Sequence, residues 1–268
     1  MRYLGQPDEG TGAQELWGCC VPQSGSLRLS LAREPAPKIG GEQVEAAPEG
    51  RPYDLVIWGA TGFTGRLMVE HLDALVSSGE TKGKLAWALA GRSEKRLRAL
   101  AAQCKSGPAV LVAQQDLEQV AAQASVFISA AGPYTQCGEA AVRACVLSRT
   151  HYVDVAGETV WLHQMIQRYH QEARAKGVLL VHACAQVCAI DDLNCYLLAQ
   201  RLGPLKQFRE YFFQFGGTTG GTFAAGAAAF EAMTEESFRV YSDPFSLGGR
   251  RSATEEDYAK SASPSRPI

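Results

Sequence analysis

The stretch that decides the fold runs from residue 55 to residue 65 and reads Leu55-Val-Ile-Trp-Gly59-Ala-Thr-Gly62-Phe-Thr-Gly65. Its opening residues are apolar without interruption, which is typical of a strand buried on both faces of a parallel sheet. Of the glycines that follow, Gly59 is expected to make a tight turn and Gly62 to let backbone N–H groups approach a pyrophosphate. Gly65 is expected to allow close packing of a helix on the strand.

The context of this loop favours a dinucleotide over a glycine-rich turn without a ligand, because a helix begins directly after it. The start of a helix presents unpaired N–H donors and a partial positive charge to phosphate groups. The residues expected to bind the cofactor here are Gly59, Thr61, Gly62, Phe63, Thr64 and Gly65.

The following residues alternate short apolar runs with helical periods. Further strands are predicted at 85–90, 110–113, 126–130, 152–155 and 178–181. Between them, apolar residues recur at helical spacing, most regularly at Leu97, Leu100 and Cys104. Strands that alternate with helices indicate βαβ units and a parallel sheet. The sequence therefore predicts an α/β fold, with a doubly wound Rossmann sheet that binds NAD(P) over residues 52–203.

The end of the second predicted strand indicates which dinucleotide is bound. It reads Ala90-Gly-Arg92-Ser93 and has no acid to accept from the ribose 2′-hydroxyl of NAD. Arg92 offers a guanidinium to a 2′-phosphate, with Ser93 and either Lys95 or Arg96 close enough to assist. NADP(H) is therefore favoured over NAD(H). The alternative is an exposed arginine at a helix start, where a cation is slightly unfavourable.

Other candidates fall at the carboxyl ends of strands, where open α/β sheets bind ligands. The small residues Ala131, Gly132 and Pro133 leave room for the ribose and the nicotinamide. Tyr134 either contacts cofactor or substrate or packs in a loop against the surface. Glu158 is a candidate proton donor or acceptor, with an ordinary acid at a helix start as the alternative.

Several remaining residues have a structural and a functional interpretation. Asp116 either approaches the adenine or simply leads into a short helix, and His182 is more often a core histidine than a catalytic one. Cys184, Cys188 and Cys195 match no zinc spacing, so no metal site is expected. The 8 cysteines have no paired framework, which is typical of free thiols in a reducing compartment.

The composition argues against two classes of partner. The formal net charge of −2 leaves no basic excess to neutralise nucleic acid or an anionic membrane. No apolar run reaches the roughly 20 residues that span a bilayer.

The two ends of the chain differ from the middle. Residues 1–51 carry Gly, Pro, Ser and Glu clusters and are predicted to be a disordered extension with too many acids for a typical transit peptide. Near the other end, a strand of a different sheet is predicted at 208–215, then an alanine-rich helix to Met233. The Gly-Thr loop at 216–222 either binds a substrate anion or is a flexible connection. Residues 242–268 are predicted to be a disordered tail.

Four blocks in this order resemble the saccharopine dehydrogenase-like oxidoreductases, a family that includes the bacterial trans-acting enoyl reductases. They are Gly59-Ala-Thr-Gly-Phe-Thr-Gly65, Ala90-Gly-Arg92, Ala131-Gly-Pro-Tyr134 with Gly138, and Asp154-Val-Ala-Gly-Glu158. The resemblance covers about residues 52–233. It implies NAD(P) binding and a smaller α+β domain that receives the substrate, of which 204–241 would be a part.

The resemblance also implies a biological setting. Family members act in lipid and glycolipid metabolism, and animal members are connected with lipid droplets and membranes. An apolar small-molecule substrate, peripheral association with a membrane or lipid droplet, and a homodimer are therefore expectations. The compartment stays open among cytoplasm, lipid droplet, membrane surface and mitochondrion.

Two departures from the family pattern bear on activity. The usual Gly-Phe-Asp-Ser-hydrophobic-Pro segment is replaced by Ala185-Gln-Val-Cys-Ala-Ile190. The family also continues well past the point where this chain ends at Ile268, so a C-terminal truncation is expected.

These observations leave three hypotheses for function. The first is an NADP-dependent oxidoreductase that moves a hydride between the nicotinamide and a C=C, C=N or C=O bond of an apolar substrate. The second is a catalytically weak NADP-binding sensor or scaffold, which the departures favour. The third is a truncated isoform that folds poorly. Whether the chain is an enzyme therefore stays open at this point.

Overall fold

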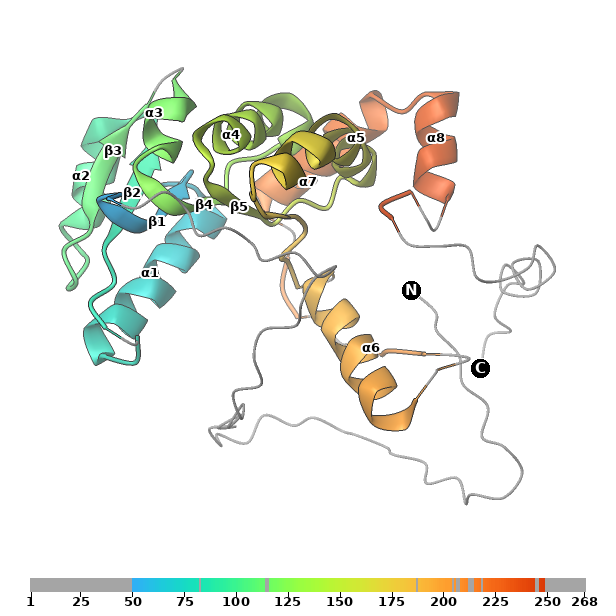
Figure 1. Ribbon diagram of the computed structural model, residues 1–268, viewed down its shortest axis with the longest axis horizontal. Helices are drawn as coiled ribbons and strands as arrows, with labels where there is room; N and C mark the ends of the chain where they lie inside the picture. Colours follow the sequence, from blue (N-terminus) through green and yellow to red (C-terminus); the bar gives the residue numbers. More distant parts are fainter. Residues whose placement is uncertain are drawn as a thin grey trace. The chain divides into compact units, whose positions relative to one another are not determined.

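The computed structural model describes residues 50–81, 83–113, 116–186, 188–203, 205, 208–211, 215–217, 219–243 and 246–248. Parallel strands form one sheet in the order β3-β2-β1-β4-β5-β6 (Figure 1). The strands are β1 (Tyr53–Trp58), β2 (Trp87–Gly91), β3 (Ala109–Val112), β4 (Ala124–Ser129), β5 (His151–Asp154) and β6 (Leu180–Val181). This is the order of a doubly wound sheet whose direction of winding changes between β1 and β4. The predicted Rossmann class is confirmed.

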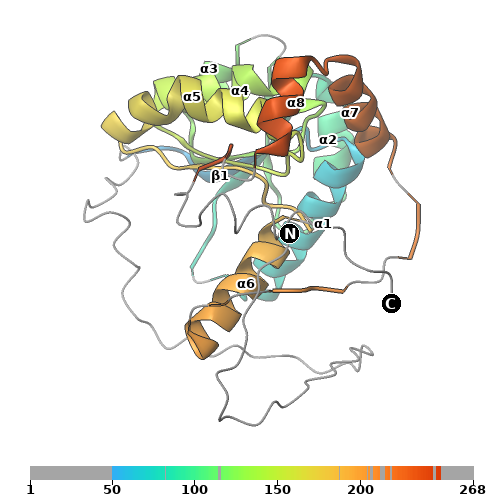
Figure 2. The ribbon, with the colours of Figure 1, turned by 90° about the vertical axis from the view of Figure 1, so that its right-hand side faces the viewer.

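Helices cover both faces of the sheet, which explains the uninterrupted apolar run in β1. Val56 belongs to a core cluster formed with α3 (Leu117–Ala121), α4 (Tyr134–Ser148) and α5 (Thr159–Ala175). Its neighbour Ile57 belongs to a second cluster, formed with α1 (Phe63–Ser78) and α2 (Glu94–Ala101). Successive strand residues point to opposite faces, so both must be apolar. Figure 2 shows α4 and α5 on the opposite side of the sheet from α1.

The register of the strands brings the predicted site segments to one edge. Trp58, the last residue of β1, lies opposite Ala90 of β2 and Ser129 of β4. Ser129 in turn lies opposite Asp154, the last residue of β5. The glycine loop and the segments that follow β2, β4 and β5 therefore leave the sheet at a common level.

Arg51 fixes the chain where it enters the first strand. Its guanidinium donates hydrogen bonds to the carbonyl groups of Ala121, Ala124 and Ser148 and to the Thr150 hydroxyl. These partners lie at the amino ends of β4 and β5, far from the glycine loop in sequence. The sequence assigned Arg51 to the disordered extension, and these hydrogen bonds show that this assignment was wrong. The sequence could not indicate them, because the acceptors are 70 or more residues away. The extension up to residue 49 lies outside the described residues.

The described residues between 186 and 215 are assigned to a different compact unit from the one that contains the sheet. This unit contains α6 (Ala189–Leu202), where Asn194 Nδ2 donates to Glu210 Oε1 at 2.7 Å. The strand predicted at 208–215 is not formed by its described residues, 208–211 and 215. The predicted domain division between residues 203 and 204 stays a prediction.

Two more helices belong to the same compact unit as the sheet. They are α7 (Gly220–Glu231), which contacts α4, and α8 (Glu235–Ser242), which contacts α5. The sequence predicted α7 but not α8. Beyond α8, the Ser246 carbonyl lies 2.5 Å from His163 Nδ1 of α5. Residues 251–268 of the predicted disordered tail lie outside the described residues. No helix within the described residues is long and apolar enough to cross a membrane.

Candidate functional site

The glycine loop joins β1 to α1 and lies against the end of β4. Gly59 has a φ of 80°, which side chains rarely adopt, and a Cβ there would meet Ala131 N at 2.9 Å. A Cβ on Gly65 would lie 2.9 Å from Ala60 Cα and closer still to the Gly59 carbonyl oxygen. Gly62 donates its own N–H to that oxygen at 2.9 Å. Glycine is required at 59 for the turn and at 65 for the close approach of α1.

The first turn of α1 leaves its backbone donors to a ligand. Gly62 is the N-cap residue, and in this fully described helix no side chain caps the first turn and no acid lies within it. Phe63, the first helical residue, is exposed. Unpaired N–H groups and the positive end of the helix dipole are therefore presented together, and a phosphate group satisfies both.

The segment after β2 carries three cations, one of which contacts the glycine loop. Arg92 and Lys95 are exposed, and Ser93 is the N-cap residue of α2 without a side-chain capping bond. Arg96 Nη2 donates to the carbonyl oxygen of Thr61 at 3.0 Å. This bond ties α2 to the glycine loop and places a guanidinium beside the predicted 2′-phosphate position.

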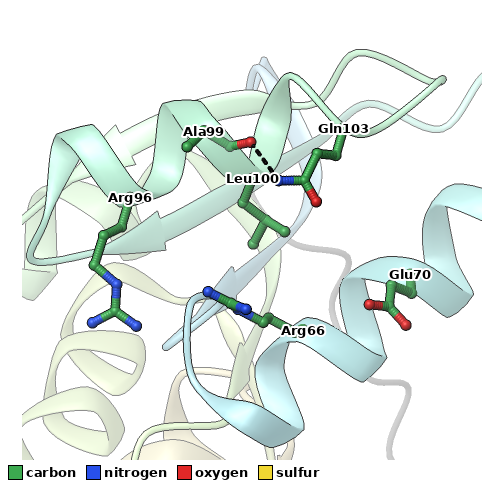
Figure 3. Close-up of a pocket in the computed structure, with 6 residues that line it drawn as sticks. All are labelled: Arg66, Glu70, Arg96, Ala99, Leu100 and Gln103. Atoms are coloured by element: carbon green, nitrogen blue, oxygen red, sulfur yellow. Dashed lines mark hydrogen bonds between the residues drawn. The ribbon is translucent and has the colours of Figure 1, made fainter.

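A groove between α1 and α2 continues this basic surface (Figure 3). It is lined by Arg66, Glu70, Arg96, Ala99, Leu100 and Gln103. Figure 3 shows the guanidinium groups of Arg66 and Arg96 directed into the groove, with Glu70 at the opposite end from Arg96.

These arginines are not neutralised by neighbouring acids. Within the part of the chain that the structure describes, Arg66, Arg92 and Arg96 form no ion pair. By contrast, Arg98 on the same helix is paired with Glu94 at 2.7 Å. Sequence reasoning missed Arg66, although its place directly after the last glycine of the loop was a usable signal.

The segment after β4 packs on the glycine loop. Ala130 N donates to Trp58 O at 2.9 Å, and Ala131 is the residue that a Cβ on Gly59 would strike. Gly132 and Pro133 then lead into α4, with Pro133 as its N-cap residue. The close approach of Ala131 is therefore a second reason why glycine is required at position 59.

Tyr134 occupies neither of its predicted environments. It is the first residue of α4 and is buried, with its ring tilted against Trp161 at a centroid distance of 5.3 Å. Its hydroxyl donates to Ser129 O at 2.8 Å and accepts from Val155 N at 3.4 Å. Burial raises the pKa of Tyr134 well above its ordinary value. Tyr134 therefore has a structural role, because its hydroxyl joins the carboxyl ends of β4 and β5.

Glu158 and Asp116 both hold helix starts. Glu158 is buried, and its Oε1 accepts from Tyr134 N at 2.9 Å while its Oε2 accepts from Gly157 N at 3.1 Å. A carboxylate at the N-terminus of α4 also matches the helix dipole. Asp116 is exposed and caps α3, accepting from the backbone N–H groups of Glu118 and Gln119. The structural interpretation accounts for each contact of these acids.

The described contact of the Gly-Thr loop is a helix cap. Thr219, in the Gly-Thr loop, caps α7 by accepting from Thr222 N at 3.1 Å. Among the described residues, no three His, Cys, Asp or Glu side chains gather where they could hold a metal ion.

An all-parallel sheet of this order, with an uncapped helix start after β1 and cations after β2, defines a Rossmann dinucleotide-binding domain. Residues 55–181 match the family model of the saccharopine dehydrogenase NADP binding domain. Residues 55–181 therefore form an NADP binding domain of the saccharopine dehydrogenase type, and the cofactor of this domain is NADP(H).

Relatives extend the similarity beyond the domain. A lipid droplet localized protein of Caenorhabditis elegans is 38% identical over 65% of this chain and 43% of that protein. A trans-acting enoyl reductase of Mycobacterium leprae is 33% identical over 77% of this chain and 52% of that protein. Among solved structures, apo saccharopine dehydrogenase (L-Glu forming) from Saccharomyces cerevisiae is 19% identical over 56% of this chain and 31% of its own, with a TM-score of 0.46. The chain spans about half the length of the curated relatives it matches.

Proposed function

We propose that this chain is part of an NADP-dependent oxidoreductase that transfers a hydride to or from an apolar, lipid-related substrate. The observation that carries the proposal is the uncapped N-terminus of α1 beside arginines that no acid neutralises. The printed activity of the mycobacterial relatives, trans-acting enoyl reductase, supports reduction of a C=C bond over that of C=N or C=O. When bound, the nicotinamide supplies the redox chemistry, and the protein orients it.

Cofactor selection is the first part of the proposal. The pyrophosphate lies at the first turn of α1, and the 2′-phosphate is held by Arg92 and Ser93 after β2. Arg96 is already aligned by its bond to Thr61. Arg66 lines the same groove from α1, and Figure 3 shows both guanidinium groups directed into it. In this proposal both groups assist in binding the 2′-phosphate.

Matched substitutions on the two helices test this selection. Arg96→Gln and Arg66→Gln should each weaken NADPH by roughly 10- to 100-fold, which corresponds to about 1.5–3 kcal/mol for a charged hydrogen bond. NADH should lose less than threefold. Arg98→Gln is the control, because Arg98 lies on the same helix but is engaged with Glu94. Equal losses for NADPH and NADH would show that these arginines do not bind a 2′-phosphate.

The reaction is tested with three probes that share a ten-carbon chain and present different reducible bonds. A trans-2-decenoyl thioester supplies C=C, decanal supplies C=O, and the N-methyl imine of decanal supplies C=N. We expect NADPH oxidation, followed at 340 nm, with the thioester first. A protein that binds NADPH but reduces none of the three would contradict the enzymatic part of the proposal and leave cofactor binding intact.

The second candidate function is an NADP-binding sensor or scaffold. The observation that favours it is that both candidate catalytic residues, Tyr134 and Glu158, are occupied by structural hydrogen bonds. A sensor would bind NADPH and NADP⁺ with different affinities and turn over neither. The name of the Caenorhabditis elegans relative supports a location at lipid droplets for either function, and a fluorescent fusion of the whole chain tests it.

A further inference from the structure

Asp154 and His182 meet at the carboxyl ends of β5 and β6. His182 Nδ1 lies 2.6 Å from Asp154 Oδ2, and the carboxylate is fully buried. The other oxygen, Oδ1, accepts from Ala156 N at 3.0 Å and from Ala183 N at 2.9 Å. Backbone donors therefore fix the carboxylate, and the carboxylate fixes one nitrogen of the imidazole ring.

The faces of this ring are fixed as well. Its centroid lies 5.6 Å from that of Tyr152 and 5.7 Å from that of Trp161, with interplanar angles of 60° and 85°. Both aromatic residues are buried. The imidazole is therefore held by edge contacts on two sides and cannot exchange its nitrogens without breaking the bond to Asp154.

The second ring nitrogen of His182, Nε2, is not engaged in a hydrogen bond within the described residues. Nε2 of His182 is buried and has no hydrogen-bond partner among the residues that the structure describes. Buried polar atoms are nearly always hydrogen-bonded, and the exceptions call for an explanation such as a ligand or catalytic role. The side chain as a whole is 11% exposed, so it lies at the boundary between the core and the edge of the sheet.

The backbone at this position is unusual. Ala183, directly after His182, has a φ of 58°, a conformation that residues with a side chain rarely adopt. It is held there by the bond from its N–H to Asp154. Backbone strain of this kind concentrates at functional sites, because elsewhere nothing maintains it.

Asp154 and His182 also lie in the half of the sheet where the nicotinamide is expected. In a doubly wound sheet the adenosine lies over the half that contains β1, β2 and β3, and the nicotinamide lies over the half that contains β4, β5 and β6. Tyr134 and Glu158 stand in this half, but their polar atoms are engaged. Of these three residues, His182 alone keeps a titratable atom for a ligand.

We propose that His182 is the acid–base residue at the nicotinamide end of the site and that Asp154 is its positioning residue. This inference rests on the proposed oxidoreductase function. When bound, the nicotinamide would supply the hydride that one atom of a polarised double bond receives in the direction of reduction. The imidazolium of His182 loses its Nε2 proton to the other atom. The neutral ring keeps its proton on Nδ1, which donates to Asp154. Nε2 then regains a proton from water.

The first test asks whether Nε2 meets the nicotinamide end. The full chain is labelled with ¹⁵N-histidine, which gives signals from only five imidazole rings, two nitrogens in each, and His182 is assigned with His182→Gln. NADP⁺ and adenosine 2′,5′-bisphosphate, which lacks the nicotinamide, are the two probes. We expect NADP⁺ to shift the Nε2 signal and the bisphosphate to leave it in place, while both ligands raise the melting temperature.

The other outcomes separate the two proposals. Stabilisation by both ligands with an unchanged Nε2 signal would overturn the role of His182 and leave cofactor binding intact. An equal shift with both ligands would also overturn it, because the effect would then come from the adenosine half. If neither ligand stabilises the protein, the proposed function fails and this inference fails with it.

The second test separates positioning from structure. Asp154→Asn should move the proton of neutral His182 from Nδ1 to Nε2, which the ¹⁵N shifts report directly. His182→Gln should bind NADPH within about twofold of the unmodified protein and reduce the thioester probe at least about 100-fold more slowly. His170→Gln, an exposed histidine on α5, is the control and should match the unmodified protein. A His182→Gln protein with unchanged turnover would contradict the proposal.

Discussion

Gly65→Ala tests the close packing of α1 on the glycine loop. The added Cβ would lie 2.9 Å from Ala60 Cα and from the Gly59 carbonyl carbon, and closer still to its oxygen. All three are backbone atoms of the turn, so no side chain can rotate away. The helix must retreat by about 1 Å to restore ordinary contact, and such overpacking costs about 1–3 kcal/mol. Because alanine favours a helix over glycine by about 0.5–1 kcal/mol, the net loss is about 1–2 kcal/mol.

The assay is thermal unfolding followed by circular dichroism, together with an NADPH titration. We expect a melting temperature lower by roughly 2–8 °C and NADPH affinity at least about tenfold weaker, because the first turn of α1 is displaced. Gly226→Ala in α7 is the matched control, since no atom lies within 4 Å of its added Cβ and it should be neutral or stabilising. Equal stability and NADPH affinity of the Gly65→Ala and unmodified proteins would refute the reasoning.

Three further predictions concern charge. Arg92→Asp should weaken NADPH about 30- to 150-fold more than NADH, measured by fluorescence titration, and equal losses would exclude a 2′-phosphate contact. Arg51→Ala should lower the free energy of unfolding in urea by about 1.5–3 kcal/mol, because it removes a charged donor from several acceptors; an unchanged midpoint would contradict this. The hydrogen bond from Arg168 at 2.6 Å lowers the pKa of Glu139 from its ordinary 4.5. This ion pair stabilises the folded protein by less than about 1 kcal/mol, because the site is exposed. The stabilisation is present above pH 4.5 and is lost as the pH falls through the lowered pKa of Glu139. Glu139→Gln should therefore be less stable than the unmodified protein only at the higher pH.

The parts of the fold that the sequence predicted are those set by local pattern. Apolar runs located the strands to within two residues at each end, because a strand covered on both faces needs apolar residues on both. Gly59 and Gly65 were identified from spacing alone, since the turn and the helix contact lie within one short loop. The strand predicted at 208–215 rested on residue propensity, which tertiary context overrides.

The parts that the sequence could not predict depend on contacts between distant residues. Tyr134 follows a Gly-Pro turn that reads as a surface loop, and it is buried because Trp161 packs on it from α5. The same contact requires glycine at position 138, because a Cβ there would lie 2.6 Å from Trp161 Cζ2. Asp154 and His182 are 28 residues apart and meet only through the order of the strands. No local pattern encodes either contact.

The cofactor is the centre of the account, and a paired titration of the full chain with NADPH and NADH tests it most directly. Nicotinamide fluorescence gives the two dissociation constants, and thermal shift reports binding independently. The account predicts that NADPH binds at least about 30-fold more tightly than NADH, as expected when a charged hydrogen-bonded contact to the 2′-phosphate is lost. Equal affinities would contradict the role of the arginines after β2 and in the groove, and the absence of binding to either would contradict the account as a whole.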